Sequence, residues 1–243
     1  MNIGVIFAGG VGRRINSKAR PKQFLEIYNK PIIIHTLEHF EGNTEIDAVV
    51  IACKEEWISY LENLLYRFRI EKVKRIIPGG STGQLSIYNG LCAAEEISGE
   101  DRAIVLIHDG VRPLITQKLL SDNIACVKQY GSAITAGIVK ETVVVIDDDL
   151  TVEQIPSRAK SRVAKAPQSF WLDEILDVQR RALGEGKNDV IDSCTLMKMY
   201  GKKLRMIDGP DENIKITTPG DFYAMRAILE AKENSQIYGF EES

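Results

Sequence analysis

Short apolar runs alternate with longer segments of helical periodicity along most of the chain, and this alternation constrains the fold more than any other feature. Apolar residues recur at helical spacing in the longer segments, whereas the short runs are continuous, as in buried strands. The expected strands are 3–7, 47–52, 73–77, 103–107 and 133–139, and the expected helices are 31–40, 55–68, 82–97 and 115–130. Repeated β–α alternation predicts an α/β fold: a mainly parallel sheet with helices on both faces.

The alternation stops after residue 139, where a two-stranded ribbon is predicted. Residues 141–146 and 151–155 have strand character, and the acidic run 147–149 separates them as a turn. A lone ribbon is only marginally stable in water, so we expect it to pack against a second subunit. Helices at 171–183, 192–200 and 219–231 and a strand at 203–207 complete the chain. We expect one domain over 1–233 with a β-arm at about 139–159, followed by a polar tail at 234–243.

Composition restricts the class of protein. The chain has 243 residues, of which 44% are hydrophobic and 27% charged, as in a soluble globular protein with one large core. A formal net charge of −3 argues against a general nucleic-acid binder. The N-terminus lacks the regions of a signal peptide, and no apolar run approaches the length of a membrane span. We therefore expect no membrane partner. The four cysteines are far apart in sequence, so we expect reduced thiols in the cytoplasm.

A glycine-rich loop follows the first expected strand and is itself followed by basic residues. Gly9, Gly10 and Gly12 allow backbone N–H groups to approach a ligand closely, and Arg14 and Lys22 add positive charge beside them. The combination indicates a polyphosphate site. A Rossmann dinucleotide loop is a rival interpretation, but the third glycine is missing and no Walker A pattern follows. A tight turn with solvated arginines is the other alternative.

Three downstream segments have two interpretations each. Asp109 ends an expected strand and is a candidate Mg²⁺ ligand, although it could instead cap the next helix or pair with Arg112. Gly80 and Ser86 lie at a strand-to-helix junction where freed backbone groups can bond a nucleobase edge, unless the glycines form a simple turn. Lys215 lies in a short β-like run and is either a ligand-binding or a solvated lysine.

One pattern suggests a different chemistry. His35, Glu38 and His39 match the H-x-x-E-H pattern of some zinc peptidases, and the two histidines would share a helix face. The same spacing also occurs on ordinary amphipathic helices. His108 is the only other histidine, and no segment supplies a coherent third ligand. A zinc hydrolase would also leave the phosphate-binding features unexplained.

Taken together, the segments resemble a known family, the cytidylyltransferases that act on polyol phosphates. Its two familiar branches make CDP-methylerythritol and CDP-ribitol. The matching segments are 8–14 (AGGVGRR), 21–25 (PKQFL), 30–36 (KPIIIHT), 79–86 (GGSTGQLS), 108–113 (HDGVRP), 155–158 (IPSR), 167–170 (PQSF), Asp192 and 213–217 (NIKIT). They follow the family's order from residue 8 to residue 217, so the resemblance covers nearly the whole chain.

The resemblance implies a GT-A-like nucleotidyltransferase fold, a homodimer with interlocking β-arms, CTP as co-substrate and Mg²⁺ as cofactor. It also implies residue roles. The catalytic residues would be Arg14, Lys22 and Lys215, which bind the triphosphate, Lys215 at the α-phosphate. Asp109 would bind the metal. The nucleotide would be bound by Ala8, Gly9, Gly10, Gly12, Gly80, Ser86, Asp109 and Arg112. Thr142 and Arg158 would reach the polyol phosphate in the partner's site, and Asp192 would also contact it.

The sequence departs from the family's pattern at two positions. Gly83 stands where an arginine usually follows the paired glycines, and Ile191 stands where a hydroxyl residue usually precedes the aspartate. These departures concern the acceptor rather than the reaction class. We therefore expect a CTP-dependent cytidylyltransferase, with ribitol 5-phosphate favoured by segments 30–36 and 155–158 and 2-C-methyl-D-erythritol 4-phosphate next. The alternative from another class is a catalytically silent, dimeric nucleotide-binding protein.

Overall fold

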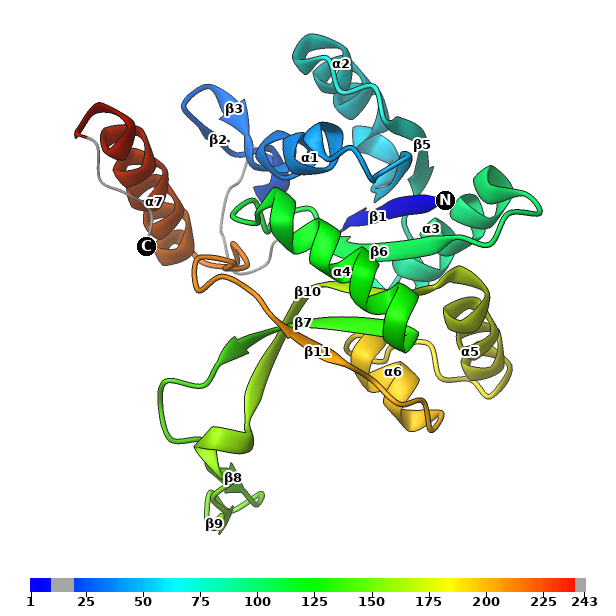
Figure 1. Cartoon of the computed structure of the whole chain (residues 1–243), viewed down its shortest axis with the longest axis vertical. Helices are drawn as coiled ribbons and strands as arrows, with labels where there is room; N and C mark the ends of the chain where they lie inside the picture. The colour runs from blue at the N-terminus through cyan, green and yellow to red at the C-terminus, as the bar shows by residue number, and fades with distance from the viewer. Residues whose placement is uncertain (10–19, 239–243) are drawn as a thin grey trace.

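The computed structural model describes residues 1–9 and 20–238 and has a central seven-stranded sheet (Figure 1). The strand order is β11-β7-β10-β6-β1-β4-β5. The strands are β1 (Asn2–Ala8), β4 (Ala48–Cys53), β5 (Val73–Pro78), β6 (Ile104–Asp109), β7 (Ser132–Ile138), β10 (Arg162–Trp171) and β11 (Met206–Asp208). All neighbouring pairs are parallel except those that β10 makes with β6 and β7. The predicted α/β class with a mainly parallel sheet is confirmed.

Helices cover both faces of the sheet. The longer helices are α1 (Ile32–Gly42), α2 (Ile58–Phe68), α3 (Gly83–Ser98), α4 (Gln117–Tyr130), α5 (Leu172–Gly184), α6 (Ser193–Met199) and α7 (Pro219–Tyr238). One apolar cluster joins the sheet to α1, α2 and α4, and a second joins it to α3, α5 and α6. Neighbouring residues of β1 divide between them: Val5 belongs to the second cluster and Ile6 to the first. Because both faces are covered, β1 is apolar on both sides, as expected of a central parallel strand.

Strand β10 is the one long sheet element that the sequence patterns do not predict. It lies antiparallel between β6 and β7, and its register with β7 shifts between Ala164 and Gln168. Pro167 falls within that irregular stretch, where a missing backbone N–H is tolerated. A proline inside a short apolar run argues against a central strand by periodicity alone, which is why this strand escapes a sequence-based search.

The predicted ribbon is present, with shorter strands than expected. Strands β8 (Val145–Ile146) and β9 (Val152–Gln154) pair antiparallel, and the Asp147 side chain accepts hydrogen bonds from the backbone of Asp149 and Thr151 in the turn. Figure 1 shows the ribbon projecting away from the sheet. Its apolar side chains are exposed, including Ile146 and, at 76%, Leu150.

Short elements complete the chain. A small hairpin of β2 (Glu26–Ile27) and β3 (Lys30–Pro31) precedes α1, and single turns η1 (Lys22–Phe24), η2 (Glu55–Trp57) and η3 (Arg158–Lys160) connect longer elements. Helix α7 continues to Tyr238, beyond the expected domain end at 233. Within the described residues, none of the helices has the length and apolar character needed to cross a membrane.

Candidate active site

The candidate site lies where four neighbouring strands end. In the sheet register Phe7 of β1 pairs with Asp109 of β6, Ala8 pairs with Cys53 of β4, and Cys53 pairs with Pro78 of β5. The carboxyl ends of these parallel strands therefore meet at one edge of the sheet, the usual place for ligands in such folds. The glycines after β1 and β5 and the carboxylate at the end of β6 are thus brought together.

A pocket of about 240 Å³, here called the first pocket, opens at this edge. It is lined by Phe7, Ala8, Gly9, Lys22, Gln23, Gly80, Ser81, Thr82, Gly83, Ser86, Asp109, Val111 and Lys215. Seven residues assigned to the nucleotide from the sequence are therefore gathered around one cavity: Ala8, Gly9, Lys22, Gly80, Ser86, Asp109 and Lys215. The other three loop residues of that assignment, Gly10, Gly12 and Arg14, lie outside the described residues.

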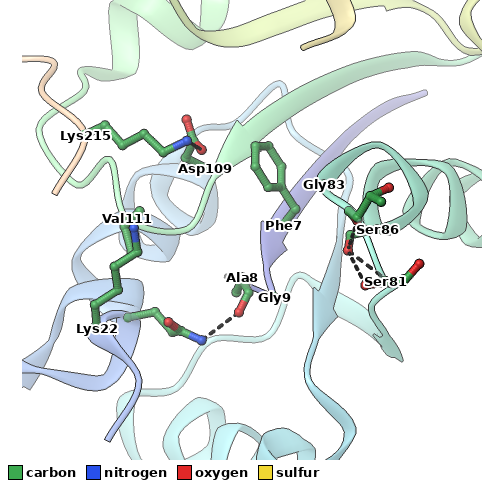
Figure 2. Close-up of a pocket in the computed structure, with 13 residues that line it drawn as sticks. Phe7, Ala8, Gly9, Lys22, Ser81, Gly83, Ser86, Asp109, Val111 and Lys215 are labelled. Carbon is green, nitrogen blue, oxygen red and sulfur yellow. Dashed lines mark hydrogen bonds and ion pairs between the residues drawn. The ribbon is translucent and has the colours of Figure 1, made fainter. Parts of the chain in front are cut away.

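Asp109 is the electrostatic centre of the pocket wall. Its side chain is only 7% exposed, and its Oδ1 lies 2.6 Å from the ammonium of Lys215 while its Oδ2 accepts a 2.8 Å hydrogen bond from Arg112 Nε. Burial alone would raise the pKa of Asp109, but the charges and hydrogen bonds of Lys215 and Arg112 outweigh it and hold the pKa below its usual value. The carboxylate is therefore ionised at neutral pH. Figure 2 shows Lys215 and Asp109 pointing toward one another.

Close packing requires a glycine at position 80. A Cβ added to Gly80 would lie 2.3 Å from the Cβ of Leu85 and 2.8 Å from its backbone carbon. The Gly80 N–H donates to Ser86 Oγ, and Ser86 Oγ donates to the Thr82 carbonyl oxygen (Figure 2). Thr82 also caps α3 by accepting a hydrogen bond from Leu85 N–H. The loop and the first turn of α3 thus form one tightly bonded pocket wall.

A buried glutamine anchors the basic segment to the strand end. Gln23 Nε2 donates a 2.6 Å hydrogen bond to the Ala8 carbonyl oxygen, and the Gln23 side chain is almost fully buried. This bond ties η1 to the end of β1, and Lys22 in the same turn lines the pocket (Figure 2). No role was expected for Gln23, because a glutamine beside a cation has no distinctive spacing in the sequence.

A second pocket, of about 210 Å³, adjoins the first. It is lined by Phe7, Gly83, Ile87, Ile107, Asp109, Arg112, Ala164, Lys165, Ala166, Gln168, Ile191, Asp192, Ser193 and Lys215. Phe7, Gly83, Asp109 and Lys215 line both pockets. Arg112, which the sequence assigned to the nucleotide, lines the second pocket rather than the first. A ligand in the first pocket would therefore meet a ligand in the second pocket beside Asp109 and Lys215.

Asp192 shapes one side of the second pocket. Its Oδ1 accepts from Thr195 N–H and caps α6, while its Oδ2 accepts from Gln168 Nε2. Gln168 Oε1 also accepts a hydrogen bond from Cys194 N–H, so the side chains of Asp192 and Gln168 are both bonded to the first turn of α6 and to each other. Next to it, Ile191 is 89% exposed and lines the same pocket. Asp192, which was expected to contact the acceptor, and Ile191, which departs from the family's pattern, thus both line the second pocket.

Thr142 and Arg158 lie in the arm and line neither pocket of their own chain. The Arg158 guanidinium donates to the Lys140 carbonyl oxygen across the base of the arm, and Thr142 is exposed. A single chain therefore does not bring these two residues to its own site. The resemblance had assigned both to the partner's site.

The histidines of the H-x-x-E-H pattern bond to the backbone instead. His35 Nε2 lies 3.2 Å from the Ile27 carbonyl oxygen, and His39 Nε2 lies 3.0 Å from that of Pro113. Glu38 pairs with Lys30 at 2.7 Å. Over residues 1–9 and 20–238, no group of three or more His, Cys, Asp or Glu side chains could hold a metal ion. The pattern is explained by helix packing, and the zinc hydrolase interpretation has no geometric support.

Comparisons with known proteins show which family the chain resembles over nearly its full length. The family model described as "IspD: 2-C-methyl-D-erythritol 4-phosphate cytidylyltransferase" matches residues 3–231. A ribitol-5-phosphate cytidylyltransferase of Streptococcus agalactiae serotype III is 54% identical over 98% of this chain and 100% of that protein. A 2-C-methyl-D-erythritol 4-phosphate cytidylyltransferase of Clostridium botulinum (strain Langeland) is 36% identical over 93% of this chain and 96% of that protein.

A solved structure has the same architecture. The 4-diphosphocytidyl-2C-methyl-D-erythritol synthase of Anaerococcus prevotii superimposes with a TM-score of 0.82 at 26% identity, covering 95% of this chain and 96% of the other. The predicted enzyme class, nucleotidyltransferase, is confirmed. With a family match over nearly its full length, the chain belongs to the IspD family of cytidylyltransferases.

Proposed function

We propose that this protein transfers CMP from CTP to ribitol 5-phosphate, giving CDP-ribitol and pyrophosphate. The observation that carries the proposal is the wall shared by the two pockets, where Asp109 and Lys215 face both cavities. A nucleotidyl transfer requires the α-phosphate of one substrate to meet the phosphate of the other, with positive charge at the meeting point. The arrangement of the two pockets supports such a meeting at Lys215.

The first pocket is assigned to CTP. The tightly packed Gly80 backbone and Ser86 form the wall for the cytosine, since backbone groups there can read the base edge at close range. Lys22 and Lys215 supply positive charge for the phosphates at the opposite side of the cavity. Ala8 and Gly9 lie between them at the end of β1.

The second pocket is assigned to the acceptor. Arg112 provides a cation, and Asp192 provides carboxylate oxygens suited to sugar-alcohol hydroxyls. Ser193 supports this assignment: its side chain is 2% exposed, and its Oγ has no hydrogen-bond partner among the described residues. A buried hydroxyl without a partner in a pocket wall is consistent with one that bonds a ligand. The presence of this second pocket argues against a silent protein that has lost its acceptor site.

The transfer itself needs charge neutralisation rather than a general base. A phosphomonoester has a second pKa near 6, so the acceptor phosphate is largely ionised at pH 7. One of its oxygens attacks the α-phosphorus of CTP, a new P–O bond forms, and the bond from the α-phosphorus to the bridging oxygen breaks. Pyrophosphate leaves with the electron pair of that bond. Lys215 stabilises the charge that develops on the α-phosphate.

Mg²⁺ is the proposed cofactor, with Asp109 as its protein ligand. The fit rests on an ionised carboxylate at the junction of the two pockets, because Mg²⁺ is commonly bound by one or two carboxylates together with substrate phosphates. The ion would neutralise phosphate charge in the first pocket. Asp109 would hold the ion, and Lys215, which pairs with Asp109 and lines both pockets, would face the α-phosphate.

The identity of the acceptor is inferred from the relatives. The Streptococcus agalactiae ribitol-5-phosphate cytidylyltransferase is 54% identical to this chain, whereas the Clostridium botulinum relative named for methylerythritol phosphate is 36% identical. Methylerythritol 4-phosphate is therefore the second candidate. We place the activity in the cytoplasm, which the four free cysteines and the use of CTP support.

The arm is proposed to form a homodimer that completes the site. Its apolar residues, among them Ile146, Leu150 and Val152, are exposed in the described part of the chain. A second copy of the arm would cover them. Arg158 and Thr142 would then reach the partner's second pocket, adding positive charge and a hydroxyl for the acceptor.

The acceptor assignment is tested by pyrophosphate release from CTP with a panel of polyol phosphates. We predict the highest kcat/KM with ribitol 5-phosphate, and a lower value with methylerythritol 4-phosphate. A higher kcat/KM with methylerythritol 4-phosphate would assign the protein to the branch of the family that makes CDP-methylerythritol. No turnover with any acceptor, despite CTP binding, would overturn the proposed activity.

The role of the shared wall is tested with Lys215→Met. We predict a loss in kcat of at least ~10²-fold, because the substitution removes a charge that stabilises the transition state. The matched control is Lys118→Met, which removes a lysine that is exposed on α4 and paired with Asp122. Wild-type turnover of Lys215→Met, or an equal loss in the control, would contradict the assignment.

The dimer proposal is tested by mixing two impaired variants, Arg158→Ala and Lys215→Met. In a mixed dimer the Arg158→Ala chain keeps its own Lys215 and receives Arg158 from its partner, so one of the two sites is complete. Random exchange of a two-fold dimer should therefore restore about a quarter of wild-type activity. If the mixture has only the summed activity of the separate variants, the arm does not act across the dimer.

A further inference from the structure

Lys165 is a cation of the second pocket to which neither the motifs nor the family resemblance assigns a role. It lies in the irregular stretch of β10, between Ala164 and Gln168, where the register with β7 shifts. Its ammonium donates hydrogen bonds to two backbone carbonyl oxygens, those of Pro210 and Asp211, each at 3.3 Å. These bonds position the charge at the pocket and use two of its three N–H donors.

Lys165 differs from the other cations of this pocket in how its charge is balanced. Arg112 and Lys215 both pair with Asp109. Within the part of the chain that the structure describes, Lys165 forms no ion pair, and the nearby Asp211 carboxylate pairs with Lys140 at 2.8 Å instead. Neutral carbonyls hold Lys165 in place, and no carboxylate of the described residues forms an ion pair with it, so the ammonium is available to an anion.

A second cation, Arg112, lies close enough to Lys165 to influence its pKa. Burial, followed by the positive charge of Arg112, lowers the pKa of Lys165, whereas Asp211 and Glu212 oppose this shift. Arg112 and Lys165 therefore repel each other. A phosphate dianion between them would relieve that repulsion and satisfy the remaining donor of Lys165.

The Lys165 side chain fits against strand β7 because residue 137 of that strand is a glycine. A Cβ added to Gly137 would lie 2.7 Å from Lys165 Cε and 3.2 Å from its Nζ. The lysine stem thus lies directly over the Gly137 backbone. Since the atoms met belong to the end of a flexible side chain, an alanine here would displace the ammonium rather than disrupt the strand.

From these contacts, and resting on the proposed function, we propose that Lys165 binds the phosphate group of the acceptor in the second pocket, together with Arg112. Lys165 would hold the nucleophilic phosphate while Lys215 meets the α-phosphate of CTP. The competing account is that Lys165 only tethers β10 to the turn at 210–211. The two accounts differ in what the loss of the charge does to each substrate.

The first test is Lys165→Met, which keeps most of the apolar stem and removes the ammonium. We predict that KM for the acceptor rises about 10- to 100-fold, as for the loss of a hydrogen bond to a charged group. KM for CTP and the melting temperature should stay at their wild-type values, and Lys165→Arg should recover part of the loss. The control is Lys72→Met, because Lys72 also bonds a backbone carbonyl, that of Asn43, but lies outside both pockets.

The second test uses Gly137→Ala in a double-mutant cycle with Lys165→Ala. Gly137→Ala alone should raise the acceptor KM by displacing the lysine, and it should have no further effect once Lys165 is alanine. The proposal is overturned if the acceptor KM is unchanged in Lys165→Met, if the KM values of both substrates rise together, or if the two changes are simply additive.

Calorimetric binding of ribitol 5-phosphate separates this inference from the proposed function. Absence of turnover by the wild-type enzyme would count against the transfer reaction. Equal affinities of the wild type and Lys165→Met for ribitol 5-phosphate would count against Lys165 alone. Weaker binding by Lys165→Met, with unchanged binding by Lys72→Met, is the result that we expect.

Discussion

The carboxylate of Asp109, bonded on one side to Lys215 and on the other to Arg112, is the interaction on which the site depends. Asp109 ends β6, whereas Lys215 belongs to a segment about a hundred positions further along the chain. Arg112 also donates to the Asn213 carbonyl oxygen, which joins that segment to the strand end a second time. One buried charge therefore assembles a wall from two distant parts of the chain, and that wall faces both pockets.

The sheet topology explains why two pockets adjoin at this point. Parallel strands β1, β4, β5 and β6 bring glycine-rich ends and a carboxylate to one edge, which forms the first pocket. Antiparallel β10 then enters beside β6 and contributes Lys165 and Gln168 to the second. The irregular register of β10 departs from regular strand geometry at the place where its side chains line a cavity. Such departures are expected where a fold serves a ligand rather than its own stability.

Periodicity was sufficient for the parallel part of the fold, because buried strands and amphipathic helices have distinct repeats. It was insufficient for β10, since this strand contains Pro167 among mixed polar and apolar residues and pairs with distant strands. Asp109 and Lys215 could be found because each lies in a motif with a recognisable setting. Lys165 could not be found in this way, because it lies outside any motif. Its role is inferred from its contacts with Pro210, Asp211 and Gly137, which are distant in sequence and are brought to it by the fold. The ends of α7 and of the arm strands also differ from expectation, as element boundaries depend on local packing.

We propose that the phosphates of the two substrates meet at the wall shared by the pockets. A crystal structure of the protein with CDP-ribitol and Mg²⁺ tests it most directly. We expect cytosine beside Gly80, the diphosphate at Lys215 and Asp109, and the ribitol chain in the pocket lined by Arg112 and Asp192. Electron density for the diphosphate away from Lys215, or for the ribitol chain outside the second pocket, would contradict it.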